Sequence, residues 1–479
     1  MTKFLFLTIL VVFSGIVFWS CSDEGSTDPS NQLPTCSISS PADFSSYSIG
    51  ETISVIVSAE DPDGDIKEVR FYIDSVGVAS VQTFPYNIEI NTDDVLPGSH
   101  ILQVVVEDDK GAETKKFLNF GILFNAPTQL EYNRIAQNSI EITWIDNSDG
   151  VEGFSIDKKS GNNEWQINYA LINQNLKTWN DPYIIENEDN SYRVRSYFEN
   201  YYSLYSDSVV VKRITPNMVF VQSDTFTMGD HFLEGELDEL PLHEVSLGNY
   251  IINKFEITQA EWSIYMTSSN YSYGSGENYP VYYLNWYEII KYCNLRSLAE
   301  NLQPCYVINN STDPNEWGEI PTNTNSIWNA VICNWEANGY RLPSEAEWEF
   351  ASRGGICWED NLRYSGSNNI DDVCWYFDNS EIAQSHPVGE KLPNQLGIYD
   401  MSGNIYEWCW DLYDETYYTT CYNLDIVYNP YGPNNNLNRI LRGSSYANGG
   451  TSPCRVASRE NLSPITKSHY IGFRVARTK

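Results

Sequence analysis

The sequence predicts a multidomain protein in which two all-β sandwiches precede a loop-rich α+β domain. Its 479 residues are too many for one ordinary hydrophobic core. Apolar residues alternate with polar ones in short runs up to about residue 213, which is typical of antiparallel strands. Beyond Met218 helix-start signals appear between long stretches rich in Gly, Asn, Pro and Tyr.

The N-terminus has the layout of an export signal. Residues 1–20 contain an apolar run from Phe4 to Trp19 after Lys3, shorter than a typical membrane span. Ser20 followed by Cys21 resembles a bacterial lipobox, so we expect Cys21 to carry a lipid. A plain signal peptide cut near Ser20, or a retained anchor, is the alternative. Residues 21–33 are predicted to form a flexible tether.

These features predict an exported protein, anchored by its lipid at the outer membrane or cell surface; secreted and periplasmic locations stay open. The net charge of −35, from 64 acidic and 29 basic residues, repels phosphate backbones and argues against a nucleic-acid partner. We expect two partners: the membrane, through the N-terminal lipid, and a protein or glycan ligand at the cell surface.

Residues 34–123 are predicted to form the first sandwich. Three alternating runs, separated by turn signals, begin at Ile53, Val69 and Leu102. This segment resembles bacterial Ig-like domains. The acidic run at Asp61, Asp63 and Asp65 either binds Ca²⁺ or forms a solvated turn.

Residues 125–213 are predicted to form the second sandwich, which resembles a fibronectin type III domain. Trp144 closes an alternating run and is the expected core anchor, Tyr192 is a candidate tyrosine-corner residue, and the last strand is expected near Val209 to Val211. Neither sandwich shows a catalytic constellation, so both are expected to act as spacers.

Residues 215–479 are predicted to form the α+β domain. Three helix starts share a small polar cap with Glu three residues later, at Thr258, Asn285 and Ser344. After Asn285 an apolar stripe follows helical spacing, and it consists of Trp286, Ile289, Ile290 and Cys293. Eight of the ten cysteines lie between Cys293 and Cys454, which suggests disulfides in an exported protein. The first expected pair is Cys305 with Cys333.

A series of sequence blocks in this domain resembles the formylglycine-generating-enzyme (sulfatase-modifying-factor) superfamily. The blocks are Phe226–Gly229, Glu239–Val245, Glu256–Trp262, Gly339–Glu349, Gly397–Asn404, Leu441–Ser444 and Gly472–Arg474. The resemblance covers roughly the last 260 residues and implies a compact relative of the C-type lectin fold.

The resemblance does not extend to the family's catalytic residues. True formylglycine-generating enzymes oxidise a substrate cysteine with two active-site cysteines and copper, a soft metal suited to thiolates. The matching positions here lie near Asn448 and Thr451, and Cys454 is the one cysteine nearby. We therefore expect no catalytic residues, with Cys454 a remote candidate, and no bound copper. The five His residues form no HxxxH pair of the kind expected for the family's iron enzymes.

The resemblance also implies a structural Ca²⁺ loop. Asp400 and Glu407 would bind through side chains, and Gly403 and Ile405 through backbone carbonyls, which supplies the oxygen ligands that Ca²⁺ prefers. The alternative is a hydrogen-bonded turn without metal.

The stretch from Ser444 to Tyr470 is the predicted ligand face. It corresponds to a ligand-binding surface in lectin-fold relatives, and its Tyr and small polar side chains suit adaptable recognition. The candidate contacts are Tyr446, Asn448, Ser452 and Tyr470. A solvated loop is the alternative. Four arginines near this stretch are expected to pair with acidic framework residues: Arg442, Arg455, Arg459 and Arg474.

The leading hypothesis is a surface lipoprotein whose C-terminal domain is a non-catalytic binding or assembly module. One alternative is an oxidoreductase of the formylglycine-generating type that modifies a Cys in a sulfatase-like substrate. Another is lectin-like carbohydrate binding.

Overall fold

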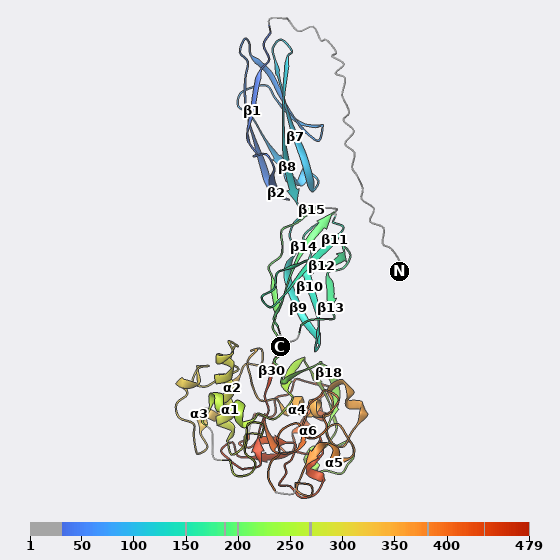
Figure 1. The fold of residues 1–479 in the computed structure, drawn as a ribbon, viewed down its shortest axis with the longest axis vertical. Coiled ribbons are helices and arrows are strands. Elements are labelled where there is room, and N and C mark those ends of the chain that lie inside the picture. The colour runs from blue at the N-terminus through green and yellow to red at the C-terminus, as the bar shows by residue number, and fades with distance from the viewer. Residues whose placement is uncertain are drawn as a thin grey trace, which may run out of the picture.

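A computed structural model describes residues 31–148, 151–185, 188–198, 201–267, 271–380, 383–434 and 436–478. The predicted signal peptide and Cys21 lie outside these ranges. Three bodies are stacked end to end: the first sandwich, the second sandwich and the C-terminal domain (Figure 1). Within the described ranges, no helix is long and apolar enough to cross a membrane.

The first sandwich packs a three-stranded sheet, in the order β1-β3-β6, against a five-stranded sheet, in the order β2-β8-β7-β4-β5. The strands are β1 (Thr35–Ser40), β2 (Ser45–Ser48), β3 (Thr52–Glu60), β4 (Ile66–Ile73), β5 (Val76–Val81), β6 (Tyr86–Asn91), β7 (Gly98–Asp108) and β8 (Glu113–Leu123). The alternation predicted from the sequence is confirmed, because Ile53, Val55, Val69 and Phe71 are all buried between the two sheets.

The second sandwich has sheets in the orders β13-β10-β9 and β12-β11-β14-β15, with β16 also paired to β14. The strands are β9 (Thr128–Ala136), β10 (Ser139–Ile145), β11 (Gly153–Ser160), β12 (Gln166–Asn173), β13 (Thr178–Asp181), β14 (Asn190–Phe198), β15 (Tyr201–Tyr202) and β16 (Val209–Val211). Trp144 is buried in the core and packs edge-on against Phe154, as expected of a core anchor.

Tyr192 is fully buried, but it does not bond to an upstream backbone group as a tyrosine corner would. Its hydroxyl donates to the Asp181 carboxylate at 2.7 Å, and Lys158 Nζ lies 2.7 Å from the same carboxylate oxygen. The Lys158–Asp181 ion pair is itself buried, and the Tyr192 hydroxyl satisfies part of the hydrogen-bonding capacity of the Asp181 carboxylate.

The C-terminal domain is mixed and rich in loops. Its α-helices are α1 (Gln259–Tyr265), α2 (Trp286–Ala299), α3 (Ser326–Asn329), α4 (Glu345–Ser352), α5 (Ile370–Val373) and α6 (Tyr417–Tyr422). Its strands are β17 (Met218–Val221), β18 (Asp224–Met228), β19 (His243–Leu247), β20 (Tyr250–Asn253), β21 (Tyr306–Val307), β22 (Ile332–Cys333), β23 (Cys374–Trp375), β24 (Ser402–Gly403), β25 (Tyr406–Leu412), β26 (Val427–Tyr428), β27 (Arg439–Arg442), β28 (Glu460–Leu462), β29 (Ile471–Gly472) and β30 (Ala476–Thr478). Short 3₁₀ turns, among them Ser452–Cys454, complete the chain.

The three predicted helix starts are confirmed. Thr258, Asn285 and Ser344 each cap a helix, and each forms the reciprocal capping box with the Glu three residues later. Helix α2 buries its predicted apolar stripe in the larger of the domain's hydrophobic clusters. Capping and burial together explain why these short helices persist among long loops.

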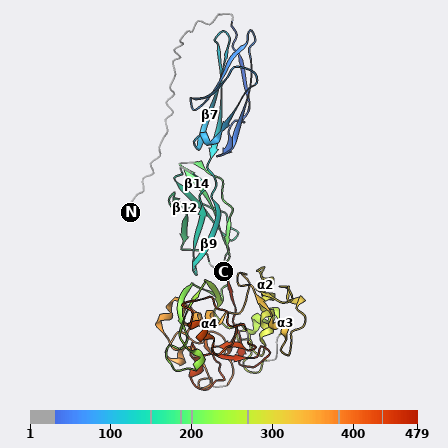
Figure 2. The same cartoon turned by 180° about the vertical axis from the view of Figure 1, so that it is seen from behind.

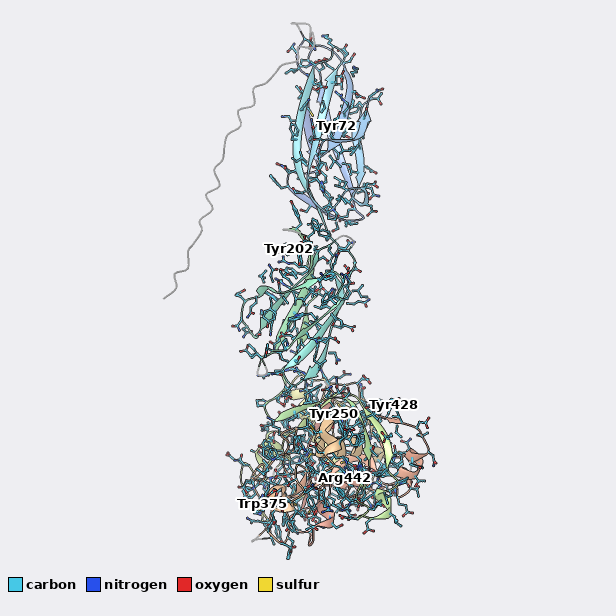
Figure 3. The ribbon with its side chains drawn as sticks, turned by 90° about the vertical axis from the view of Figure 1, so that its right-hand side faces the viewer. Tyr72, Tyr202, Tyr250, Trp375, Tyr428 and Arg442 are labelled. Atoms are coloured by element: carbon cyan, nitrogen blue, oxygen red, sulfur yellow. The ribbon has the colours of Figure 1, made fainter. Side chains whose placement is uncertain are left out.

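Buried ion pairs connect other parts of the domain to helix α4, to β25 and to Glu239. The four arginines predicted to be framework residues are all buried and paired: Arg442 with Glu345 and Glu349, Arg455 with Glu239, Arg459 with Glu345, and Arg474 with Glu407. In Figure 3, Arg442 lies well inside the C-terminal domain. These arginines are therefore structural and are not presented to a ligand.

Polar contacts join the second sandwich to the C-terminal domain. The Phe220 amide donates to the Gln137 side chain at 2.8 Å, and the Asn249 side chain donates to the Arg134 carbonyl at 3.2 Å. The neighbouring Tyr250 lies at the end of the domain that faces the sandwich (Figure 3). β30, at the C-terminus, pairs with β20 in the same region (Figures 1 and 2).

Cys305 and Cys333, the expected disulfide pair, are both free thiols in the structure. Cys305 Sγ donates to the Gly339 carbonyl at 3.3 Å instead. On the paired strands Cys333 lies opposite Tyr306 and not opposite Cys305.

Candidate functional site

The predicted ligand face contains a cavity of about 330 Å³ beside the four-stranded sheet β28-β27-β25-β29. We call this cavity the face pocket; its lining consists of Tyr406, Leu441, Ala447, Asn448, Glu460, Leu462 and Tyr470. Three adjacent strands supply Tyr406, Leu441, Glu460 and Leu462, so a rigid framework positions most of the wall.

Two of the four candidate contacts line the face pocket. Asn448 is held by a hydrogen bond from Ser445 Oγ to its side-chain oxygen at 2.6 Å, and its carbonyl accepts from the Phe377 amide at 3.2 Å. Tyr470 is half-buried, and its carbonyl accepts from the Tyr406 amide at 2.9 Å. Backbone hydrogen bonds thus hold both residues in place, while their side chains border the cavity.

The other two candidates lie elsewhere. Tyr446 is only 1% exposed, and its hydroxyl lies 2.5 Å from His469 Nδ1, so it supports the face from beneath and is not presented on it. Burial is the reason: a Tyr ring gains from an apolar site when its hydroxyl finds a partner. Ser452 is exposed but does not line the pocket.

Tyr406 and Glu460 are functional candidates that the sequence alone did not indicate. Burial and the negative charge of Glu460 raise the pKa of Tyr406 to about 12, which keeps its hydroxyl protonated and able to donate. The rings of Tyr406 and Tyr470 meet edge to face with centroids 6.3 Å apart. The pocket thus combines aromatic surface, an amide and a carboxylate.

Cys454 has a neighbouring thiol that sequence spacing did not predict. Cys374, on β23, lies in the same buried cluster as Cys454, and the two thiols are near enough to interact. Both residues are fully buried in a cluster with Tyr364, Ile370, Val373 and Tyr376. Neither sulfur opens onto the face pocket. Both sulfurs are therefore enclosed within the domain in this structure.

The predicted Ca²⁺ loop contains an unusual concentration of buried carboxylates. Burial raises the pKa of Asp400 to about 6, although the hydrogen bond from the Gly389 amide acts to lower it. Burial and the charges of Asp400 and Glu407 raise the pKa of Glu256 well above its ordinary value. Arg474 is the cation paired with this group. The raised pKa values reflect the cost of keeping these buried carboxylates ionised beside a single guanidinium, a cost that a bound hard cation would lower.

The side chains of the loop differ in how free their oxygens are to bind such a cation. Asp400 Oδ1 is buried and has no hydrogen-bond partner in the described part of the chain, so it is available as a ligand. Glu407 is already engaged: Arg474 donates to both of its oxygens at 2.6 Å, and Trp348 Nε1 donates at 2.8 Å. Across the described residues, no group of three or more His, Cys, Asp or Glu side chains is placed to hold a metal ion, so backbone carbonyls would have to complete the set.

The loop backbone is specialised. Asp400, Gly403 and Asn404 all have positive φ, at 59°, 85° and 59°. A Cβ on Gly403 would lie 2.3 Å from the Trp375 carbonyl oxygen and 2.4 Å from Cys374 Sγ. Only glycine therefore allows β24 to pack this closely against β23.

The Asp61, Asp63 and Asp65 run in the first sandwich has a charge partner within the protein. Asp63 pairs with Lys110 at 2.8 Å, and its other oxygen accepts from the Gln32 amide at 3.0 Å. The Asp65 carbonyl accepts from the Asp109 amide at 2.9 Å. This geometry fits the solvated-turn alternative.

Comparison with known proteins matches residues 207–479 to the sulfatase-modifying factor enzyme 1-like domain and residues 34–104 to a bacterial Ig domain. A protein from Paenibacillus barcinonensis described as the chaperone protein LppX is 45% identical over 184 residues, which is 35% of this chain and 64% of that protein. The formylglycine-generating enzyme of Streptomyces coelicolor is 28% identical over 295 residues, 55% of this chain and 90% of the enzyme. Among solved structures, Treponema denticola variable protein 1 is 30% identical with a TM-score of 0.48, covering 57% of this chain and 96% of its own.

Proposed function

Because the chain belongs to the sulfatase-modifying factor enzyme 1-like family, we propose that it is a surface lipoprotein whose C-terminal domain binds a ligand without catalysis. The observation that carries the proposal is the face pocket, which is lined by Tyr, Asn, Glu and Leu side chains, while Cys454 is buried beside Cys374. Asn448, which lies near one of the positions that match the enzymes' cysteine pair, lines this pocket. The two sandwiches would then present this surface away from the membrane.

The ligand we favour is a protein, because the LppX relative is named a chaperone and the pocket has the aromatic and polar lining of a protein-recognition site. The edge-to-face pair of Tyr406 and Tyr470 supports a second candidate, a glycan, whose apolar sugar faces pack on aromatic rings. Peptide libraries and glycan arrays probed with the full chain separate the two. Retention on one and not on the other decides the ligand class.

Substitution of the face pocket is expected to abolish most of that binding. Tyr470→Ala and Asn448→Ala each remove a wall of the cavity, and truncation of such a contact costs about 2 kcal/mol or more, roughly a 30-fold loss of affinity. Surface plasmon resonance against the retained ligand measures it. Ser452→Ala is the matched control, because Ser452 belongs to the same stretch but lies outside the pocket. Equal losses in all three variants would contradict binding at this pocket.

The purified chain is also expected to be inactive as a formylglycine-generating enzyme. Cu(I) and a Cys-x-Pro-x-Arg peptide would be added to the full chain, and the peptide mass followed, with the Streptomyces coelicolor enzyme as the positive control. The reason is that two soft thiolates are needed to hold Cu(I) in an open site, whereas Cys374 and Cys454 are both fully buried. Stoichiometric aldehyde formation would overturn the proposal in favour of the oxidoreductase alternative.

Ca²⁺ fits the loop that precedes β25 and would serve a structural role there. Asp400 would bind through Oδ1, Gly403 and Ile405 through carbonyls, and Glu407 through lone-pair capacity left beside Arg474. Bound Ca²⁺ is expected to stabilise the domain, by about 2.7 kcal/mol at 100 times Kd. In Asp400→Asn this gain should vanish, while the metal-free domain is expected to keep its stability because the amide carries no buried charge.

Thermal unfolding of both proteins, with Ca²⁺ or with a chelator, checks this expectation. Asp63→Asn, at the acidic turn of the first sandwich, is the control and should leave the Ca²⁺ response unchanged. A wild-type protein with the same Tm in Ca²⁺ and in chelator would exclude the site.

A further inference from the structure

The two thiols of Cys374 and Cys454 come from segments far apart in the sequence, and the fold brings them into contact. Ser402 connects the two segments: it pairs with Cys374 between β24 and β23, and its hydroxyl donates to the Cys454 carbonyl at 2.8 Å. The two thiols, which are free in the structure, lie in one buried cluster and are near enough to interact.

The pair lies directly beneath the predicted ligand face. Residues 447 and 449–452 are exposed, and this exposed loop ends at Cys454 in the 3₁₀ turn Ser452–Cys454. Cys374 is the first residue of β23. The amide of Phe377, two residues after this strand, donates to the Asn448 carbonyl. A covalent link between the two sulfurs would therefore fix both ends of the loop that carries Asn448.

We propose that Cys374 and Cys454 form a disulfide in the mature protein, which anchors the end of the face loop to β23. Each thiol gives up one proton and one electron, an Sγ–Sγ bond forms, and the oxidant is a disulfide, either of a thiol–disulfide oxidoreductase or of a small thiol, which is cleaved to two thiols. The exchange takes place during folding, before burial closes access to the sulfurs. Once formed, the bond is enclosed by Tyr364, Ile370, Val373 and Tyr376 and is shielded from reductants.

The bond itself does not depend on what the face pocket binds, so it is tested without a ligand. The full chain would be unfolded and refolded in buffers of oxidised and reduced glutathione, then denatured, alkylated, digested and analysed by mass spectrometry. The expected result is a cross-linked peptide containing Cys374 and Cys454 as the dominant disulfide. Recovery of both cysteines in alkylated form under the oxidising condition, or linkage of either to a different cysteine, would overturn the proposal.

Two variants test the assignment, one that removes the bond and one that serves as its control. Cys454→Ser is expected to release Cys374 as a free, alkylated thiol and to remove the cross-linked peptide. Cys409→Ser is the matched control, since Cys409 is equally buried and free but has no such partner in the described residues. Loss of the 374–454 peptide in the Cys409 variant would contradict the assignment. If Cys454→Ser does not fold, the wild-type peptide map alone still decides.

Discussion

Replacing Glu407 by Gln is expected to lower the free energy of unfolding of the C-terminal domain by about 3 to 5 kcal/mol. Glu407 is fully buried, and its two oxygens accept from Arg474 Nε, Arg474 Nη2 and Trp348 Nε1. A Gln side chain offers one oxygen and one NH₂ group, so a donor would face another donor. Arg474 would also lose the carboxylate that it contacts directly.

Denaturant unfolding of the full chain, followed by tryptophan fluorescence, measures this loss as a shift of the C-terminal domain's transition. The control is Glu234→Gln, which removes a surface pair with Arg363 in which both side chains are about a third or more exposed. Such a pair contributes at most about 1 kcal/mol. A loss for Glu407→Gln no larger than that of the control would show that the buried pair is not a main support of the domain.

Arg442→Met is expected to cost a similar amount, about 3 to 5 kcal/mol, for a different reason. Arg442 connects β27 to helix α4: Nη2 lies 2.5 Å from Glu349 and Nη1 lies 3.3 Å from Glu345. It also donates to the carbonyls of Val456 and Ala457 at 2.8 and 3.1 Å, so its loss removes one donor from each of these carboxylates and carbonyls.

The ionisation of Glu349 shows how much this donor matters. Burial acts to raise the pKa of Glu349, but Arg353, Arg442 and the Gly229 amide outweigh it and hold the pKa below its ordinary value. Without Arg442, one of these compensating charges is gone. Differential scanning calorimetry should show a lower Tm for the C-terminal domain in Arg442→Met and almost none of that shift in Arg363→Met. Equal Tm values for the two variants would contradict the argument.

Local features of the sequence predicted the fold well. Strand alternation in the two sandwiches, the capping boxes of α1, α2 and α4, and the apolar stripe of α2 depend on residues within a few positions of one another, so their physics can be recognised without the fold. The acidic partners of the four framework arginines were expected as a class, since a buried guanidinium needs a carboxylate. The family of the C-terminal domain was identified from ordered sequence blocks.

The features that the sequence did not predict all depend on long-range register. Cys374 stands in a segment with no motif of its own, and only the pairing of β23 with β24 brings it to Cys454. Tyr446 and Asn448 are two residues apart, yet one is buried under His469 and the other lines the face pocket. Tyr406 and Glu460 join that pocket because β25, β27 and β28 are neighbours in one sheet.

The pairing of β30 with β20 has a practical consequence for handling the protein. The last strand, Ala476–Thr478, lies at the neck between the second sandwich and the C-terminal domain, whereas Trp375 lies at the opposite end of that domain (Figure 3). An affinity tag or fluorophore fused after residue 479 would therefore emerge at the neck. A chain immobilised on a sensor chip through such a tag would leave the Trp375 end facing solution, and two residues beyond Trp375 the Phe377 amide donates to the carbonyl of Asn448 in the face pocket.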